Sequence, residues 1–172
     1  MNRPDNYYQH HWQRPPVLDR ERFALLLADL AALAPHVGCE LSYGTEDGPC
    51  LGPELIAFND GLEEEDEKGD DFLLERDVSG LDPSLYEEDG LYADYCETQG
   101  LPYDRFVRLT LVALSVRFPE ATVWPGADLR GWVKAYRAYA QIILGGRLKI
   151  YERKNLRAFA ALGGGRAAPA ET

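Results

Sequence analysis

PYDRFVRLTLVALSVRFP, residues 102–119, is the stretch that decides the fold, because it predicts a helix that is apolar on almost every side. Pro102 suits the first turn of a helix, and Asp104 complements the positive end of its dipole. Pro119 ends the helix. The apolar residues between them are Phe106, Val107, Leu109, Leu111, Val112, Leu114 and Val116. A helix with almost no polar face is buried, so we expect it at the centre of the protein.

Toward the N-terminus, the sequence predicts a second helix followed by short strands. From Asp19, which can cap a helix, Phe and Leu recur at helical spacing until Pro35 and Gly38 end the run. The β-prone runs that follow are CELSY (39–43), ELIAF (54–58) and FLLER (72–76), with YADYC (92–96) as a short strand or a helical turn. Residues 1–18 carry three prolines and little periodicity, so we expect an extended arm there rather than a regular element.

Toward the C-terminus, ATVW (121–124) predicts a short strand, and a last long helix begins near Asp128. One stripe of this helix is apolar and consists of Leu129, Trp132, Val133, Tyr136, Ala140, Ile143 and Leu144. The opposite stripe is polar and consists of Arg130, Lys134, Arg137 and Gln141. Such a pattern is typical of a helix that packs on one face and meets solvent on the other. Residues 147–172 are expected to form a short basic helix and a flexible tail.

Strands that cluster early and strong helices that come late favour an α+β fold. We expect a small, mostly antiparallel sheet with a buried helix and two or three further helices packed on it. Residues 19–146 would form a single α+β domain, which suits a chain of 172 residues with 45% apolar side chains.

The net charge of −11 is distributed unevenly along the chain. Residues 40–98 hold 20 Asp and Glu against Lys68 and Arg76, whereas residues 129–172 carry a net charge of +7. An acidic segment repels phosphate, which argues against direct nucleic-acid binding there. Residues 59–71 are predicted to be a solvated, mobile loop, and its acidic run consists of Glu63, Glu64, Glu65, Asp66 and Glu67. This loop is either a binding surface or a device that only keeps the protein soluble.

Several classes of protein are disfavoured by the sequence. No run approaches the roughly 18 apolar residues of a membrane span, and no secretory signal is visible, so we expect a soluble, cytoplasmic protein. Cys39, Cys50 and Cys96 are an odd number at spacings that match no zinc pattern, which predicts free thiols and no bound metal. The short motifs that name a reaction or a nucleotide site are missing, so no cofactor is predicted.

YCETQGLPYD, residues 95–104, is the stretch that best fits an enzyme. It leads into the N-terminus of the buried helix, where amide donors and the dipole can lower the pKa of a thiol. A site between this turn and the FNDG turn (58–61) would draw on Asn59, Asp60, Cys96, Thr98, Tyr103 and Asp104. The alternative is structural: a half-buried Cys96, with Thr98 and Asp104 capping the helix.

The succession FNDG (58–61), DDFLLERD (70–77), YCETQGLPYD (95–104) and a terminal helix bearing Trp132 resembles a group of small bacterial and phage proteins with no established activity. The resemblance covers roughly residues 54–144. It implies an accessory or phage-related role and supplies no functional residue.

Three functions remain open from the sequence. The first is a non-enzymatic protein that binds an unidentified protein partner through the segregated charges, with Glu63 to Glu67 on the acidic side and Arg130, Lys134 and Arg137 on the basic side. The second is the small enzyme described above. The third is a structural or assembly protein, for which a homo-oligomer would be the sign.

Overall fold

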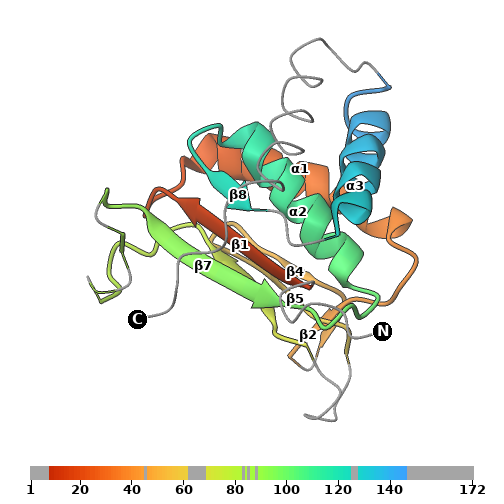
Figure 1. Ribbon diagram of the computed structural model, residues 1–172, viewed down its shortest axis with the longest axis horizontal. Helices are drawn as coiled ribbons and strands as arrows, with labels where there is room; N and C mark the ends of the chain where they lie inside the picture. The colour runs from red at the N-terminus through yellow and green to blue at the C-terminus, as the bar shows by residue number, and fades with distance from the viewer. Residues whose placement is uncertain are drawn as a thin grey trace.

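The helix α2 (Asp104–Arg117) lies at the centre of the fold, with ten of its residues buried. In the computed structural model, which describes residues 8–44, 46–61, 69–82, 84, 86–87, 89–124 and 128–146, α2 packs against α1 (Arg20–Leu33) and α3 (Leu129–Ile142). The three helices gather on one side of the strands (Figure 1). The predicted α+β fold with a buried central helix is therefore confirmed.

Local caps explain where two of these helices begin. The Asp19 side chain accepts a 2.9 Å hydrogen bond from the backbone N–H of Arg22, and Asp128 accepts one of 3.1 Å from Gly131. Each carboxylate satisfies an amide that the first turn leaves without a partner. The cap predicted at Asp19 is confirmed. A 3-10 turn, η1 (Ala34–His36), follows α1.

The first sheet has the strand order β7-β1-β8 and is antiparallel throughout. Its strands are β1 (Gln9–Arg14), β7 (Tyr92–Glu97) and β8 (Thr122–Trp124). YADYC is thus strand rather than helical turn. The expectation of an arm before Asp19 is wrong for residues 9–14, which form the central strand. His10, Trp12 and Arg14 are buried in alternation with more exposed neighbours, and two of these three are too polar to signal a buried strand.

A second antiparallel sheet has the order β4-β5-β6, formed by β4 (Cys50–Leu51), β5 (Leu55–Phe58) and β6 (Phe72–Glu75). The strands predicted at ELIAF and FLLER are confirmed. CELSY contributes only β2 (Ser42–Tyr43), which pairs with β3 (Glu46–Asp47) in a small ribbon. Cys39, Glu40 and Leu41 lie outside the ribbon because only two residue pairs form.

A chain of aromatic rings joins the two larger sheets to the central helix. The ring of Trp12 on β1 lies 5.3 Å from that of Phe72 on β6, and Phe72 stacks at 4.8 Å on Phe58 of β5. Phe58 in turn lies 4.6 Å from Phe106 of α2. All four side chains are buried, so burial of their apolar surface holds the sheets against the helix.

The packed face of α3 differs in part from the predicted stripe. Trp132, Tyr136 and Ala140 are buried as expected, but Leu129 is 38% exposed and Tyr139 is buried in its place. Leu129 is the first residue of the helix, where little covers it. Arg130, Lys134 and Arg137 are exposed, as the sequence predicts. Within the described part of the chain, no helix has the length and apolarity needed to span a bilayer.

Two predictions fall on residues outside the described ranges. These are the acidic loop, Glu63 to Glu67, and the basic short helix and tail at 147–172.

Candidate binding cleft

Cys96 and Tyr103, two of the predicted catalytic candidates, are sealed in the core. Both are 0% exposed. The Tyr103 hydroxyl donates a 2.7 Å hydrogen bond to the backbone carbonyl of Asp70, and the Cys96 Sγ lies 3.8 Å from the same oxygen. Burial raises the pKa of both groups well above their usual values. Cys96 is therefore held as a neutral thiol, which is the opposite of what a nucleophile requires.

Thr98 and Asp104, two further candidates, belong to a buried polar cluster. The Thr98 hydroxyl donates a 2.6 Å hydrogen bond to Asp104 Oδ1, and His10 Nε2 lies 2.7 Å from the same oxygen. The Arg108 guanidinium pairs with the other carboxylate oxygen at 2.6 Å. Burial alone would raise the pKa of Asp104, but the contacts with His10, Arg108 and Thr98 outweigh it and lower the pKa. The Asp104 carboxylate is thus charged and fully engaged.

Asn59 and Asp60 lie at the turn after β5. The Asn59 carbonyl oxygen accepts hydrogen bonds from the Ser42 hydroxyl at 2.7 Å and from the backbone N–H of Gly61 at 2.9 Å. Its amide donates to Asp71 at 2.9 Å. These bonds give Asn59 the role of a turn-former, since it fixes Gly61 at a φ of 73°. Asp60 is half-buried beside it.

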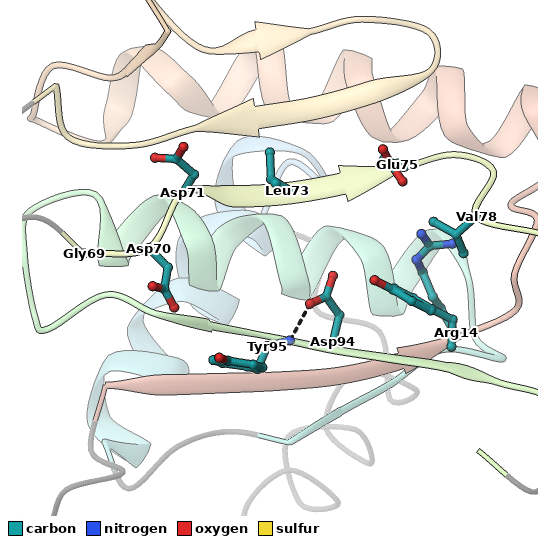
Figure 2. Close-up of a pocket in the computed structure, with 10 residues that line it drawn as sticks. Arg14, Gly69, Asp70, Asp71, Leu73, Glu75, Val78, Asp94 and Tyr95 are labelled. Atoms are coloured by element: carbon teal, nitrogen blue, oxygen red, sulfur yellow. Dashed lines mark hydrogen bonds between the residues drawn. The ribbon is translucent and has the colours of Figure 1, made fainter. Parts of the chain in front are cut away.

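A cleft of about 640 Å³ opens elsewhere, between β6 and β7 (Figure 2). It is lined by Arg14, Gly69, Asp70, Asp71, Leu73, Glu75, Val78, Tyr92, Asp94 and Tyr95. None of the six predicted catalytic candidates lines it. Three of them lie next to it, because Tyr103 and Cys96 contact the backbone carbonyl of Asp70 and Asn59 donates to Asp71.

The cleft exists because two sheet edges meet only at their ends. At one end, the Asp70 N–H donates to the Glu97 carbonyl at 2.8 Å, and the Glu97 N–H donates to the Asp70 carboxylate at 2.9 Å. At the other end, the Val78 N–H donates to the Pro16 carbonyl at 2.9 Å. Between these points, no pair between β6 and β7 is seen among the described residues, and Tyr92 at the start of β7 forms an antiparallel bridge with Tyr86 instead. Among the described residues, β6 and the rest of β7 therefore each present an unpaired edge to the cleft.

Four carboxylates gather at this cleft, all from the acidic middle of the chain. Asp70, Asp71 and Glu75 are exposed, and Asp94 is half-buried. Burial raises the pKa of Asp94, although the Tyr95 backbone N–H and the charge of Arg14 act against it. Tyr92 and Tyr95 add aromatic surface beside these acids, and Tyr95 is 58% exposed. The cleft is suited to cationic groups on a chain that can also pack against rings.

Among the described residues, Arg14 is the one basic residue that lines the cleft, and it is 1% exposed. Its Nη1 donates to the carbonyls of Pro15 at 3.1 Å and Pro16 at 3.4 Å, and its guanidinium lies 5.2 Å from the centre of the Tyr92 ring. No described carboxylate lies within ion-pair distance, and its Nε has no acceptor among the described residues. Burial lowers the pKa of Arg14, while Tyr92 and Asp94 act to raise it.

The sequence missed the cleft for identifiable reasons. Arg14 lies in the segment that the sequence predicts to be an extended arm, and Glu75 lies in a predicted strand with no sign of a binding role. Asp94 carried the one usable signal, because a carboxylate inside a β-prone run such as YADYC departs from strand preference. Within the described ranges, no group of three or more His, Cys, Asp or Glu is placed to hold a metal ion.

Comparison of the chain with family models, with curated proteins and with solved structures finds no significant match. The resemblance to small bacterial and phage proteins stays a prediction.

Proposed function

We propose that this protein is a non-enzymatic binding protein that takes an extended, basic segment of a protein partner into the cleft between β6 and β7. The observation that carries the proposal is the gathering of four carboxylates, Asp70, Asp71, Glu75 and Asp94, around one concave site. Opposite charge speeds the encounter of two proteins and selects among partners.

The shape of the cleft supports an extended ligand. Its two long walls are edges of β6 and β7 that, among the described residues, are unpaired apart from the bridge between Tyr92 and Tyr86 at one end. A free strand edge offers backbone donors and acceptors that an added strand can pair with. Leu73 and Tyr95 stand exposed on these strands, so apolar surface lies beside the charges. A basic peptide with occasional apolar side chains matches both features.

The enzyme alternative gains no support from the geometry of its candidates. Cys96, Thr98 and Tyr103 are 0% exposed, and the Asp104 carboxylate already holds three partners. A nucleophile and its base have to reach a substrate. The same carboxylates make the cleft a poor place for nucleic acid, because they repel phosphate.

The test is binding of an acetylated and amidated tetralysine peptide, measured by titration calorimetry. The variant Glu75→Gln/Asp94→Asn removes two cleft charges and should weaken binding about tenfold, as expected when close charge pairs are lost. The control Glu21→Gln/Glu40→Gln removes two exposed charges that do not line the cleft and should leave the affinity within about twofold. Equal losses in both variants would mean that only net charge matters, and the proposal would fail.

A further inference from the structure

We propose that Arg14 forms a carbonyl-binding subsite at one end of the cleft, so that the ligand is a peptide backbone and not a simple polycation. This inference rests on the proposed function and names the chemistry of its ligand. It starts from a buried guanidinium in the cleft wall that, among the described residues, has no ionic partner and leaves one donor unsatisfied.

The donors of Arg14 are only partly used. Its Nη1 serves the carbonyls of Pro15 and Pro16, which hold the guanidinium in place, and its Nε has no acceptor among the described residues. A buried donor without an acceptor costs about 1–3 kcal/mol. Nε is shielded in the unbound protein, so a ligand in the cleft removes this cost when a shift of the Arg14 side chain brings Nε to the acceptor of the ligand.

The acceptor is a neutral oxygen. Asp94 and Glu75 act electrostatically on Arg14 from the same cleft, so an incoming carboxylate or phosphate would meet their repulsion. An amide carbonyl has no net charge and accepts a hydrogen bond from a guanidinium. Peptides carry such a carbonyl at every residue, whereas polyamines carry none.

The two ends of the cleft differ in chemistry, which gives the ligand a direction. Figure 2 shows Arg14 at one end and Asp70 with Asp71 at the other, with Glu75 and Asp94 between them. A bound peptide places a backbone carbonyl at Arg14 and its Lys or Arg side chains along the carboxylates. A polyamine satisfies the carboxylates and leaves the Arg14 donor unmatched.

The experiment compares two probes of equal charge on the intact protein: the acetylated and amidated tetralysine peptide, and spermine. Both are titrated while the side-chain Nε–H resonance of Arg14 is followed by NMR in ¹⁵N-labelled protein. We expect the peptide to bind about tenfold more tightly than spermine, the ratio for one net hydrogen bond to a charged group. We also expect only the peptide to shift the Arg14 resonance.

Assignment of the resonance uses Arg14→Lys, with Arg22→Lys as the control, because Arg22 is exposed and pairs with Glu120 outside the cleft. If Arg14→Lys does not fold, the resonance is assigned in the unaltered protein instead. The comparison of the two probes then still tests the subsite. Equal affinities with an unmoved Arg14 resonance overturn the subsite and leave the acidic cleft intact as a cation site. Absence of binding by both probes overturns the proposed function itself.

Discussion

The Tyr139 hydroxyl on α3 donates a 2.7 Å hydrogen bond to the Asp29 carboxylate on α1. Asp29 is 5% exposed and also accepts two bonds from Arg117 of α2, at 2.8 and 2.6 Å. One buried carboxylate therefore joins all three helices. Both carboxylate oxygens of Asp29 accept hydrogen bonds, and these charge-assisted bonds offset the cost of burying the carboxylate. Another arrangement of the three helices would break them.

We expect Tyr139→Phe to lower the free energy of unfolding by about 1.5–3 kcal/mol, because it removes a bond to a buried charge and keeps the ring. The measurement is the denaturant midpoint. Tyr95→Phe is the matched control, since Tyr95 is 58% exposed, and it should change the stability by less than about 0.5 kcal/mol. If the two variants lose the same small amount, the Asp29 cluster does not stabilise the helix arrangement.

Asp104 should make the stability of the protein depend on acidity. Its contacts hold its pKa below the usual value of about 3.9 in an unfolded chain, so its ionised form stabilises the fold at every pH above that value. This contribution is lost as the pH falls below about 4 and through the folded-state pKa. Asp104→Asn should cost about 1.5–3 kcal/mol at pH 7, because it weakens the buried bonds to a charged carboxylate, while Arg108 keeps its ion pair with Asp128.

Unfolding curves of Asp104→Asn between pH 7 and pH 3 check this assignment, since the variant should lose stability less steeply on acidification than the parent. Glu21→Gln, at an exposed position, is the control and should keep the parental slope. An unchanged slope in Asp104→Asn would show that the carboxylate is not the group that titrates.

Trp132 should anchor α3, whereas Leu129 should not, although the sequence places both on the apolar stripe. Trp132 is 3% exposed and lies edge-on against His10 at 5.5 Å, but Leu129 is 38% exposed. Trp132→Ala should cost about 3–5 kcal/mol. Leu129→Ala should cost less than about 1 kcal/mol. Denaturant midpoints measure both changes in stability. Equal losses of stability would mean that Leu129 packs in the core as Trp132 does.

The helices could be predicted because their periodicity is local. α1 shows apolar residues at helical spacing after a cap at Asp19, and α2 is a nearly continuous apolar run between two prolines. No distant residue is needed to recognise either helix. β1 could not be predicted in this way. The Nε2 atom of its buried His10 bonds to Asp104, 94 residues further along the chain, so the reason for burying this residue becomes visible only after folding.

The cleft could not be predicted from the sequence, for a related reason. It depends on where two edges separate, and that is fixed by the pairing of Asp70 with Glu97 at one end and of Pro16 with Val78 at the other. The acidic composition of residues 40–98 predicted that carboxylates would matter. The densest acidic run in that segment is Glu63–Glu67, but the carboxylates that line the cleft come later in the chain, at Asp70, Asp71, Glu75 and Asp94.

Kinetics of partner binding should separate the cleft from the acidic run. Neutralising Glu63, Glu64, Glu65, Asp66 and Glu67 should slow association and flatten its dependence on salt, because exposed charges steer encounter over about 10 Å at 0.1 M salt. Dissociation should stay unchanged. Glu75→Gln/Asp94→Asn should instead speed dissociation about tenfold, because charges that contact the ligand hold the complex together.

Stopped-flow or surface-based binding of the tetralysine peptide at several salt concentrations gives both rates, with Glu21→Gln/Glu40→Gln as the control for net charge. Far-ultraviolet circular dichroism of each variant shows that the fold is kept. Contact between charges acts mainly on dissociation, whereas steering acts on association. If the cleft variant changes only the association rate, Glu75 and Asp94 attract the ligand from a distance and do not contact it in the complex. A loop variant that changes dissociation would place Glu63–Glu67 in contact with the ligand and move the binding site away from the β6–β7 cleft.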